Sequence, residues 1–467
     1  MSGDIRIERD SLGEVRVPAN ALYGAQTQRA LENFPISGQR FPRRFIRALG
    51  LVKRVAALTN GELSLIDQER AQAIATAARE VEDGTWDEEF VLDVYQTGSG
   101  TSTNMNANEV IASRAAQLLE GEGLQVHPND HVNFGQSSND VIPTALHVSA
   151  RISLLEDLIP ALESLESALR KKSEAFDGVL KSGRTHLMDA TPIRLGQEFA
   201  GWARQVELGK HRVEAASDEL AELALGGTAT GTGINTHEQF PTRAIKKLSA
   251  FTGIPFLEAR DHFEAQGAKD GAVAVSGALN TVATSLMKVA DDIRWLASGP
   301  TSGIGELLLP AVQPGSSIMP GKVNPVLSEA LMMVAARVMG NHSTITIAGS
   351  RGNLELNTMM PVLTLALLES IELLARGCRA FTDRCVVGIE ADPARCRELL
   401  EKNPAVATAL NLRLGYEVAS EVAKEAVRDG ATVREVVLRR GLVPEDELDE
   451  ILNVRHMTEG GLDHGSR

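Results

Sequence analysis

The chain has 467 residues, of which 43% are hydrophobic and 23% are charged, which is typical of a soluble globular enzyme with room for about three domains. Its formal net charge of −15 argues against nucleic acid or an anionic membrane as a partner. Aromatic residues make up only 4%, and abundant alanine and leucine favour helices over sheets.

The N-terminus and the cysteines indicate the compartment. The first residues, MSGDIRIERDS, hold charges and no apolar run, so no signal peptide is predicted. No uncharged apolar stretch reaches the ~20 residues that span a membrane. Cys378, Cys385 and Cys396 fit no zinc or C-x-x-C spacing, and their odd number favours reduced thiols that pack between helices. We therefore expect a cytoplasmic protein.

Helical patterning dominates the chain after an irregular start. Residues 1–40 are predicted to be irregular because Gly13, Pro18 and Pro35 interrupt them. Helices are then predicted over 41–83, 106–120, 141–172, 194–225, 271–296, 326–347 and 358–385, with shorter ones at 393–402 and 433–440.

The clearest pattern lies in 271–296, where apolar residues recur in steps of four and three. They are Val275, Leu279, Val282, Leu286, Val289, Ile293 and Leu296. This heptad spacing indicates a helix packed at a shallow angle against other helices. A similar row, Ile152, Leu155, Ile159 and Leu162, contains Pro160, which predicts a kink rather than a break. Several such stripes need partners beyond one bundle, so we expect self-association.

Two runs of small polar residues precede predicted helices. Thr97–Asn104 and Gln136–Asp140 can each cap a helix N-terminus, where free N–H groups and the helix dipole favour an anion. Either run alone could be a capping turn without a ligand, and Asp140 could serve only its own helix. Together they indicate a pocket for several carboxylate oxygens. No G-x-G-x-x-G motif occurs, so a dinucleotide site is not supported.

Histidines supply candidate titrating groups. His186, in the run Gly183–Asp189, is a candidate acid or base, although a lone histidine is more often structural. His127 and His131 are four residues apart, which on a helix would suggest a metal pair. Pro128 lies inside that spacing and no third ligand is near, so no metal site is predicted.

The stretch Gly315–Pro325, GSSIMPGKVNP, is predicted to be a loop because it holds two glycines and two prolines. A serine near a lysine on such a backbone can become a strong base, since positive charge and N–H groups stabilise an alkoxide. A P-loop is excluded because Val323 follows Lys322, and S-x-x-K acyl transfer is disfavoured because Lys322 is six residues after Ser316. The plain alternative is a surface loop without chemistry.

This loop closely resembles the signature loop of the fumarase/aspartase superfamily, and its form with Gly321 is similar to class II fumarate hydratases. Aspartases usually carry alanine there. The segment GAQTQR near Tyr23 and the runs GSGT, HPND, SSND and TH occur in the family's order. The resemblance covers about residues 5–456. Leu124 and Gln125 stand where relatives often have basic residues.

The resemblance implies a mainly all-α fold. It implies a three-domain subunit with a central long-helix bundle, and a homotetramer with a 20-helix core whose active sites are shared between subunits. The expected domains are 1–136, which is mixed or helical, 137–361, which forms the long-helix bundle, and 362–467, which is helical. No cofactor and no metal are implied, and the expected partner is a small dicarboxylate rather than nucleic acid or a membrane.

The activity implied by the resemblance is the reversible hydration of fumarate to L-malate, by anti addition of water through an aci-carboxylate carbanion. Ser316 would be the base with help from Lys322, and Glu329 would orient His186, which handles the water. Residues implied in substrate binding are Ser99, Gly100, Thr101, Ser137, Ser138, Asn139, Thr185, Ser317, Lys322, Val323 and Asn324. A second, non-catalytic anion site is implied at His127, Pro128, Asn129 and Asp130.

Three alternatives stay open at this point. Aspartate ammonia-lyase shares the fold and the base, and Gly321 argues against it. Argininosuccinate and adenylosuccinate lyases have looser signature loops and lack the GAQTQR start. An inactive helical scaffold would not be expected to keep Ser316, Lys322, His186 and Glu329 together.

Overall fold

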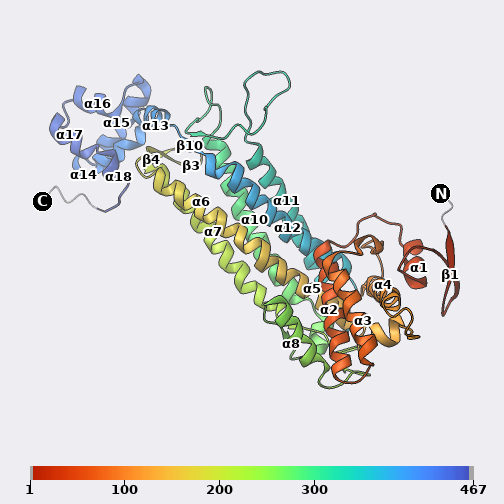
Figure 1. Ribbon diagram of the computed structural model, residues 1–467. Coiled ribbons are helices and arrows are strands. Elements are labelled where there is room, and N and C mark those ends of the chain that lie inside the picture. The colour runs from red at the N-terminus through yellow and green to blue at the C-terminus, as the bar shows by residue number, and fades with distance from the viewer. Residues whose placement is uncertain (1–3, 462–467) are drawn as a thin grey trace. The chain divides into compact units, whose positions relative to one another are not determined.

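The computed structural model describes residues 4–461 and is mainly helical, as predicted (Figure 1). Its strands pair in two-stranded sheets. Long helices occupy the centre of the chain, as the predicted long-helix bundle requires. They are α6 (Ile159–Ala175), α7 (Leu195–Ser217), α10 (Asp270–Leu296), α11 (Val326–Gly349) and α12 (Met360–Arg384).

Contacts group the chain into two compact units. Unit 1 comprises Met1–Ala161, Gly209–Thr284 and Val334–Arg376, and unit 2 comprises Leu162–Leu208, Ser285–Met333 and Gly377–Arg467. The division into the consecutive segments 1–136, 137–361 and 362–467 follows the chain rather than its contacts, and it stays a prediction.

Unit 1 holds the N-terminal hairpin and the helices around α4. Its elements outside the long helices are β1 (Ile5–Asp10), β2 (Gly13–Pro18), α1 (Ala25–Asn33), α2 (Arg43–Glu62), α3 (Gln68–Asp83), η1 (Asp87–Glu89), α4 (Thr101–Leu118), the π-helical turn η2 (Pro128–Val132), α5 (Ser138–Ser153), the π-helical turn η3 (Leu154–Leu158), η4 (Asp218–Leu220), β5 (Glu222–Leu223), α8 (Phe240–Thr252), β6 (Leu257–Glu258), α9 (His262–Gly267), β8 (Gly352–Asn353) and β9 (Leu356–Asn357). Helices α2 and α3 lie side by side.

Unit 2 holds the hairpin of β3 (Leu180–Thr185) and β4 (Met188–Arg194) and the C-terminal helices. The remaining elements are β7 (Leu307–Leu308), η5 (Val386–Gly388), β10 (Glu390–Ala391), α13 (Pro393–Glu401), η6 (Pro404–Leu410), α14 (Asn411–Leu414), α15 (Tyr416–Asp429), α16 (Val433–Arg439), α17 (Glu445–Ile451) and α18 (Val454–Met457). A separate apolar core, which includes Leu410, Val422 and Val436, holds the C-terminal helices together.

The heptad prediction for α10 is confirmed. All seven predicted positions, from Val275 to Leu296, are at most 6% exposed. Among residues 4–461, α10 also meets the length and hydropathy of a membrane span, with 44% of the apolar window buried inside the chain. A buried heptad stripe accounts for that hydropathy, because a core helix of a soluble bundle has the same composition.

The row around Pro160 departs from the prediction at Leu155, whereas Ile152, Ile159 and Leu162 are buried. The helical path continues through Pro160, but the π-helical turn η3 precedes it. A π-helical turn accommodates one extra residue, and the buried positions shift accordingly. Leu154 and Leu158 are fully buried, whereas the predicted Leu155 is only half-buried.

The prediction of an irregular 1–40 is wrong. Strands β1 and β2 pair as an antiparallel hairpin, and α1 follows. The GAQTQR segment forms the start of α1, where the Glu109 carboxylate of α4 accepts N–H groups from Gly24, Gln26 and Thr27 at 2.9, 2.9 and 3.1 Å. An internal anion therefore stabilises this helix N-terminus.

Candidate active site

The GSGT turn in unit 1 is shaped by two glycines. A Cβ on Gly98 would lie 1.8 Å from the backbone oxygen of Thr358, so no side chain fits there. Gly100 has φ +73°, which favours glycine, and it is followed at once by α4. The hydroxyls of Ser99 and Thr101 lie 2.7 Å apart at this helix end. The run forms the N-terminus of α4, as predicted, but the N-cap residue is Gly100, which has no side chain to cap the helix.

The SSND run forms the second predicted cap, at the start of α5. Ser137 accepts the N–H of Asn139 and donates its own N–H to Asp140, at 3.2 and 2.9 Å. The second carboxylate oxygen of Asp140 accepts N–H groups from Gly226 and Thr228, at 2.9 and 3.0 Å. Asp140 therefore serves its own helix and also fixes the glycine-rich 226–228 segment.

A polar network links α4 to the SSND cap within unit 1. The Asn104 amide of α4 donates to Ser138 Oγ at 3.0 Å. Behind them, the Lys53 ammonium of α2 donates to Asn133 Oδ1 and Gln136 Oε1, at 2.9 and 3.0 Å. Sequence reasoning missed Lys53, because the apolar face of α2 gives no sign that a lysine points inward.

Lys53 and Asp140 are both fully buried, and their pKa values move toward each other. Burial lowers the pKa of the Lys53 ammonium to about 7, and the charge of Asp140 acts in the opposite direction. Burial raises the pKa of the Asp140 carboxyl to about 6, although its N–H donors and Lys53 oppose the shift. A cation near the caps adds positive potential where anions are expected to bind.

Stability should respond to pH through Lys53. Its pKa falls from 10.5 to about 7 on folding, so between those values the unfolded state binds one more proton. The free energy of unfolding should therefore rise by about 1.4 kcal/mol per pH unit from pH 7 to 9, relative to Lys53→Met. Urea unfolding at several pH values measures this difference. Parallel curves for the two proteins would mean that Lys53 keeps an ordinary pKa in the folded chain.

The HPND run, expected to be a second anion site, forms the π-helical turn η2. His127 Nδ1 lies 3.2 Å from the Asp130 carboxylate, and the backbone N–H of His127 donates to His131 Nδ1 at 2.8 Å. Arg70, which sequence reasoning missed, binds the Gln125 carbonyl at 2.7 Å. Burial, followed by the charge of Arg70, lowers the pKa of His131. Arg70 thus provides a cation near a segment that itself lacks basic residues.

A metal is not indicated by the side chains present. In the described part of the chain, no group of three or more His, Cys, Asp or Glu residues is arranged to hold a metal ion.

In unit 2, Thr185 and His186 lie at the tip of the β3–β4 hairpin. Thr185 pairs with Met188, which leaves His186 and Leu187 as a two-residue turn with φ +56° and +61°. Two positive φ values are typical of a type I′ turn, which matches the twist of a hairpin. The hairpin holds the His186 side chain exposed rather than buried, so the structural alternative of a core histidine does not apply.

Buried ion pairs anchor this hairpin. Glu306 is fully buried and binds Arg184 through two parallel bonds of 2.9 Å. Lys181, also fully buried, lies 3.1 Å from Glu306 and 2.9 Å from Glu198. Burial opposes the charge of Arg184, but Glu306 outweighs it and raises the pKa of that guanidinium. Arg184 precedes Thr185 directly, so the network fixes the strand that carries both site residues.

Replacing Glu306 with glutamine should therefore be strongly destabilising. The buried Lys181 and the half-buried Arg184 would lose their shared carboxylate, and breaking a buried ion pair typically costs about 3–5 kcal/mol. Thermal and urea unfolding measure the loss. Glu398→Gln, an exposed acid on α13, is the control and should change stability by less than about 0.5 kcal/mol. Equal effects of the two substitutions would contradict an anchoring role for Glu306.

The Gly315–Pro325 segment is a loop, as predicted, and it is closed by its own backbone. Gly315 N–H donates to the Lys322 carbonyl at 2.8 Å, and the Asn324 amide donates to the Gly315 carbonyl at 2.7 Å. Inside this closure, Ser316 Oγ accepts N–H groups from Ile318 and Met319, at 3.2 and 3.0 Å. Two N–H donors on one hydroxyl oxygen favour its ionised form.

The remaining loop residues are open to solvent. Ser317, Lys322 and Val323 are exposed, and the Lys322 ammonium makes no ion pair or hydrogen bond with residues 4–461. Gly321 has φ +78° and free space around it, so an alanine would be limited by backbone strain rather than by contact. Glu329 lies in the first turn of α11, and its exposed carboxylate is likewise unpaired within the described residues.

The structure brings some predicted residues together and leaves others apart. Within unit 1, Ser99 and Thr101 lie together at the start of α4, and Asn104 of the same helix donates to Ser138 of the SSND cap. Within unit 2, neither His186 nor Glu329 makes a hydrogen bond or ion pair with the other described residues, so the expected His186–Glu329 pair is not formed inside one chain. That pair stays a prediction.

Comparisons with known proteins identify the family. The chain matches the lyase family model over residues 13–340 and the fumarase C C-terminus model over residues 406–459. It is 55% identical to a class II fumarate hydratase of Halobacterium salinarum, covering 99% of both chains. It is 52% identical to one of Corynebacterium glutamicum, covering 97% of this chain and 96% of the relative.

A solved structure agrees with these relatives. The class II fumarase of Schistosoma mansoni superposes with a TM-score of 0.95 at 38% identity, covering 98% of this chain and 99% of the other. The lyase fold, the loop around Ser316 and the relatives all lead to one assignment. The chain belongs to the class II fumarate hydratase family of the fumarase/aspartase superfamily of lyases.

Proposed function

We propose that this lyase catalyses the reversible hydration of fumarate to L-malate. The observation that carries the proposal is the closed loop in which Ser316 Oγ accepts two backbone N–H groups. In its ionised, alkoxide form, an oxygen held in this way can accept the proton of a weakly acidic C–H bond. Relatives more than 50% identical over almost the whole chain carry the name class II fumarate hydratase, which favours hydration over the aspartase alternative.

In the dehydration direction, Ser316 removes the C3 proton of L-malate. The electron pair left on C3 spreads into the adjacent carboxylate, which takes the aci form with two negative charges. Donors that tighten as this charge grows lower the barrier, because they bind the transition state more strongly than the substrate. Lys322 and Asn324 follow Ser316 on the same loop and are proposed to supply such donors.

Protonation of the leaving hydroxyl, on the face of the substrate opposite Ser316, is assigned to His186. It donates a proton to the C2 hydroxyl, which leaves as water when the C2–O bond breaks and the double bond forms. A carboxylate beside the imidazole keeps it oriented and favours its protonated form, and Glu329 is proposed for that part. Removal of the C3 proton and loss of the hydroxyl from opposite faces gives the anti stereochemistry.

The two carboxylates of the substrate are assigned to the caps of unit 1 and to the polar groups near Ser316 and His186. The caps offer Ser99, Thr101, Ser137, Ser138 and Asn139, with Gly100 as the tight turn between the hydroxyls. Thr185, Ser317 and the Val323 backbone complete the proposed set. Helix N-termini suit carboxylates because their N–H groups and dipole attract negative charge. The HPND turn, with Arg70 near it, is proposed as the second anion site.

We further propose a cytoplasmic homotetramer with active sites shared between subunits. His186 and Glu329 have no partner within residues 4–461, although both belong to unit 2. Apolar side chains on the long helices, such as Met333 and Ile347, are 68% and 56% exposed. Exposed apolar side chains on a bundle helix favour burial against a partner, and other subunits would cover them.

Ultraviolet absorbance of the fumarate double bond tests the function. Purified protein should raise the absorbance when L-malate is added and leave it unchanged with L-aspartate. A rise in absorbance with L-aspartate alone would agree with the fold and the serine base, but it would mean that the leaving group is ammonia rather than water. Unchanged absorbance with both substrates would indicate a larger substrate or an inactive scaffold.

Subunit mixing tests the shared site. Ser316→Ala and His186→Asn proteins should each be inactive, and unfolding and refolding them together should restore part of the activity, because mixed tetramers contain some sites with both residues intact. If tetramers shown to contain both variants regained no activity, Ser316 and His186 of each active site would have to come from the same subunit.

A further inference from the structure

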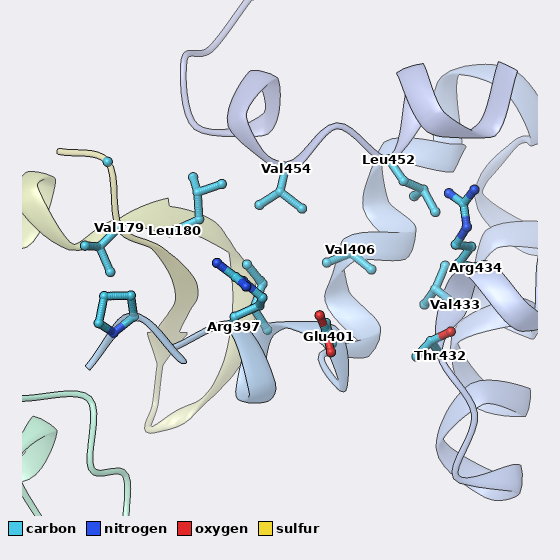
Figure 2. A pocket seen from close by; sticks show the side chains of 13 residues that line it. Val179, Leu180, Arg397, Glu401, Val406, Thr432, Val433, Arg434, Leu452 and Val454 are labelled. Carbon is cyan, nitrogen blue, oxygen red and sulfur yellow. The ribbon is translucent and has the colours of Figure 1, made fainter. Parts of the chain in front are cut away.

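A cavity of about 490 Å³ lies in unit 2, between the start of β3 and the C-terminal helices (Figure 2). It is lined by residues that the proposed reaction does not use. Its volume falls in the range of about 300–1,000 Å³ that is usual for small-molecule sites.

The wall of this cavity is largely apolar. Val179 and Leu180 come from the β3 side, Val406 from η6, Leu452 from the end of α17 and Val454 from the start of α18. All five are half-buried. Val406 and Leu452 also pack against the C-terminal apolar core, so a ligand in the cavity would extend that core. Filling the cavity with an apolar group would therefore remove further apolar surface from water.

Two opposite charges in the lining are left without partners. Arg397 and Glu401 lie one turn apart on α13, a spacing at which such residues commonly pair. Neither makes an ion pair or hydrogen bond with residues 4–461, and both are exposed. Figure 2 shows Arg397 between Leu180 and Glu401, with the apolar side chains around them.

The neighbouring polar groups are already engaged. Arg434 binds Asp449 and Glu445, and Thr432 binds Glu435. On the other side of α13, Glu398 binds Arg395 and Lys402. Arg397 and Glu401 therefore differ from the charged residues around them in having their charges free toward the cavity.

We propose that this cavity binds a free apolar α-amino acid. Arg397 takes the carboxylate through a paired hydrogen bond, Glu401 takes the ammonium, and the side chain of the ligand contacts the apolar wall. A simple anion would be repelled by Glu401 and a simple amine by Arg397, so the pair selects a molecule that carries both charges close together. Because the charges are exposed, we expect dissociation constants of roughly 0.1–1 mM.

Isothermal titration calorimetry on the full-length protein tests the proposal, with L-leucine, L-isoleucine, L-methionine and L-phenylalanine as probes. At least one should bind at one site per chain. The analogues 4-methylpentanoate, without the ammonium, and 3-methylbutylamine, without the carboxylate, should bind about 10-fold or more weakly than leucine. No heat of binding from any probe at 20-fold above the expected range would overturn the proposal.

Variants place the ligand. Arg397→Gln and Glu401→Gln should each weaken binding about 10-fold or more. Glu398→Gln, on the same helix, and Lys402→Gln, at its C-cap, lie outside the lining and should leave binding unchanged. Unchanged affinity in the first pair would mean that the amino acid binds elsewhere. Repeating the amino acid titration in the presence of saturating L-malate separates this site from the active site. If malate abolished amino acid binding, the proposal would be overturned, whatever the outcome of the activity assay.

Discussion

Replacing Ser316 with alanine is expected to lower kcat for malate dehydration by about 1,000-fold to 10,000-fold, because the C3 proton loses its base. Binding of an unreactive dicarboxylate such as succinate should change only a few-fold. The Ser316 oxygen is engaged by the N–H groups of Ile318 and Met319, and the carboxylates are assigned to other residues. Initial rates by absorbance and succinate affinity by calorimetry give the two numbers.

Retained succinate binding also shows that the altered loop still folds. The matched control is Ser302→Ala, an exposed serine in the loop between α10 and β7, which should keep full turnover. If Ser316→Ala kept more than a tenth of the activity, Ser316 would be removed as the base, and another group would have to take the C3 proton.

The second large effect is expected at His186. His186→Asn should lower kcat by about 100-fold to 1,000-fold, since the hydroxyl would leave without a proton donor. Glu329→Gln should lower kcat in the same direction, because the imidazole would lose its carboxylate. If the two residues act as one unit, the double variant should be little worse than the worse single variant.

If the decrease in kcat of the double variant equalled the product of the two single decreases, the pairing would be contradicted and Glu329 would have a separate role. His456→Asn is the control, because this exposed histidine near the C-terminus lies outside the proposed site. Measurement of kcat and KM for all four proteins distinguishes a lost proton donor from weakened substrate binding.

The long helices were predictable because their apolar spacing is regular over many turns. Helix α10 was expected over 271–296 and occupies Asp270–Leu296, with the predicted heptad positions buried. Leu155 was misplaced because a π-helical turn shifts the phase by one residue, and nothing in the local spacing indicates where such a turn lies. The hairpin of β1 and β2 was missed because its alternation is short and interrupted by charged residues.

The turns and helix ends of the candidate site were predictable from the sequence, but the buried charged residues that hold them in place were not. The start of α4 at Thr101, the cap at Ser137 and the Ser316 loop follow from residue types that favour turns and helix ends. Lys53, Glu109 and Glu306 were not found, because each acts on a segment distant in the sequence. Their partners, at Asn133, Gly24 and Arg184, are 80, 85 and 122 residues away. The spacing of apolar residues indicates which face of a helix is buried, but it does not indicate which charged side chains pair with one another.

The central claim is that the chain adds water to fumarate with anti stereochemistry through a C3 carbanion. Hydration of fumarate in D₂O, followed by proton NMR, tests it most directly. We predict L-malate with one deuterium at C3, in the diastereomer that anti addition produces and that the vicinal coupling constant identifies. The syn diastereomer, or no malate from fumarate while ammonia and fumarate give aspartate, would contradict the account.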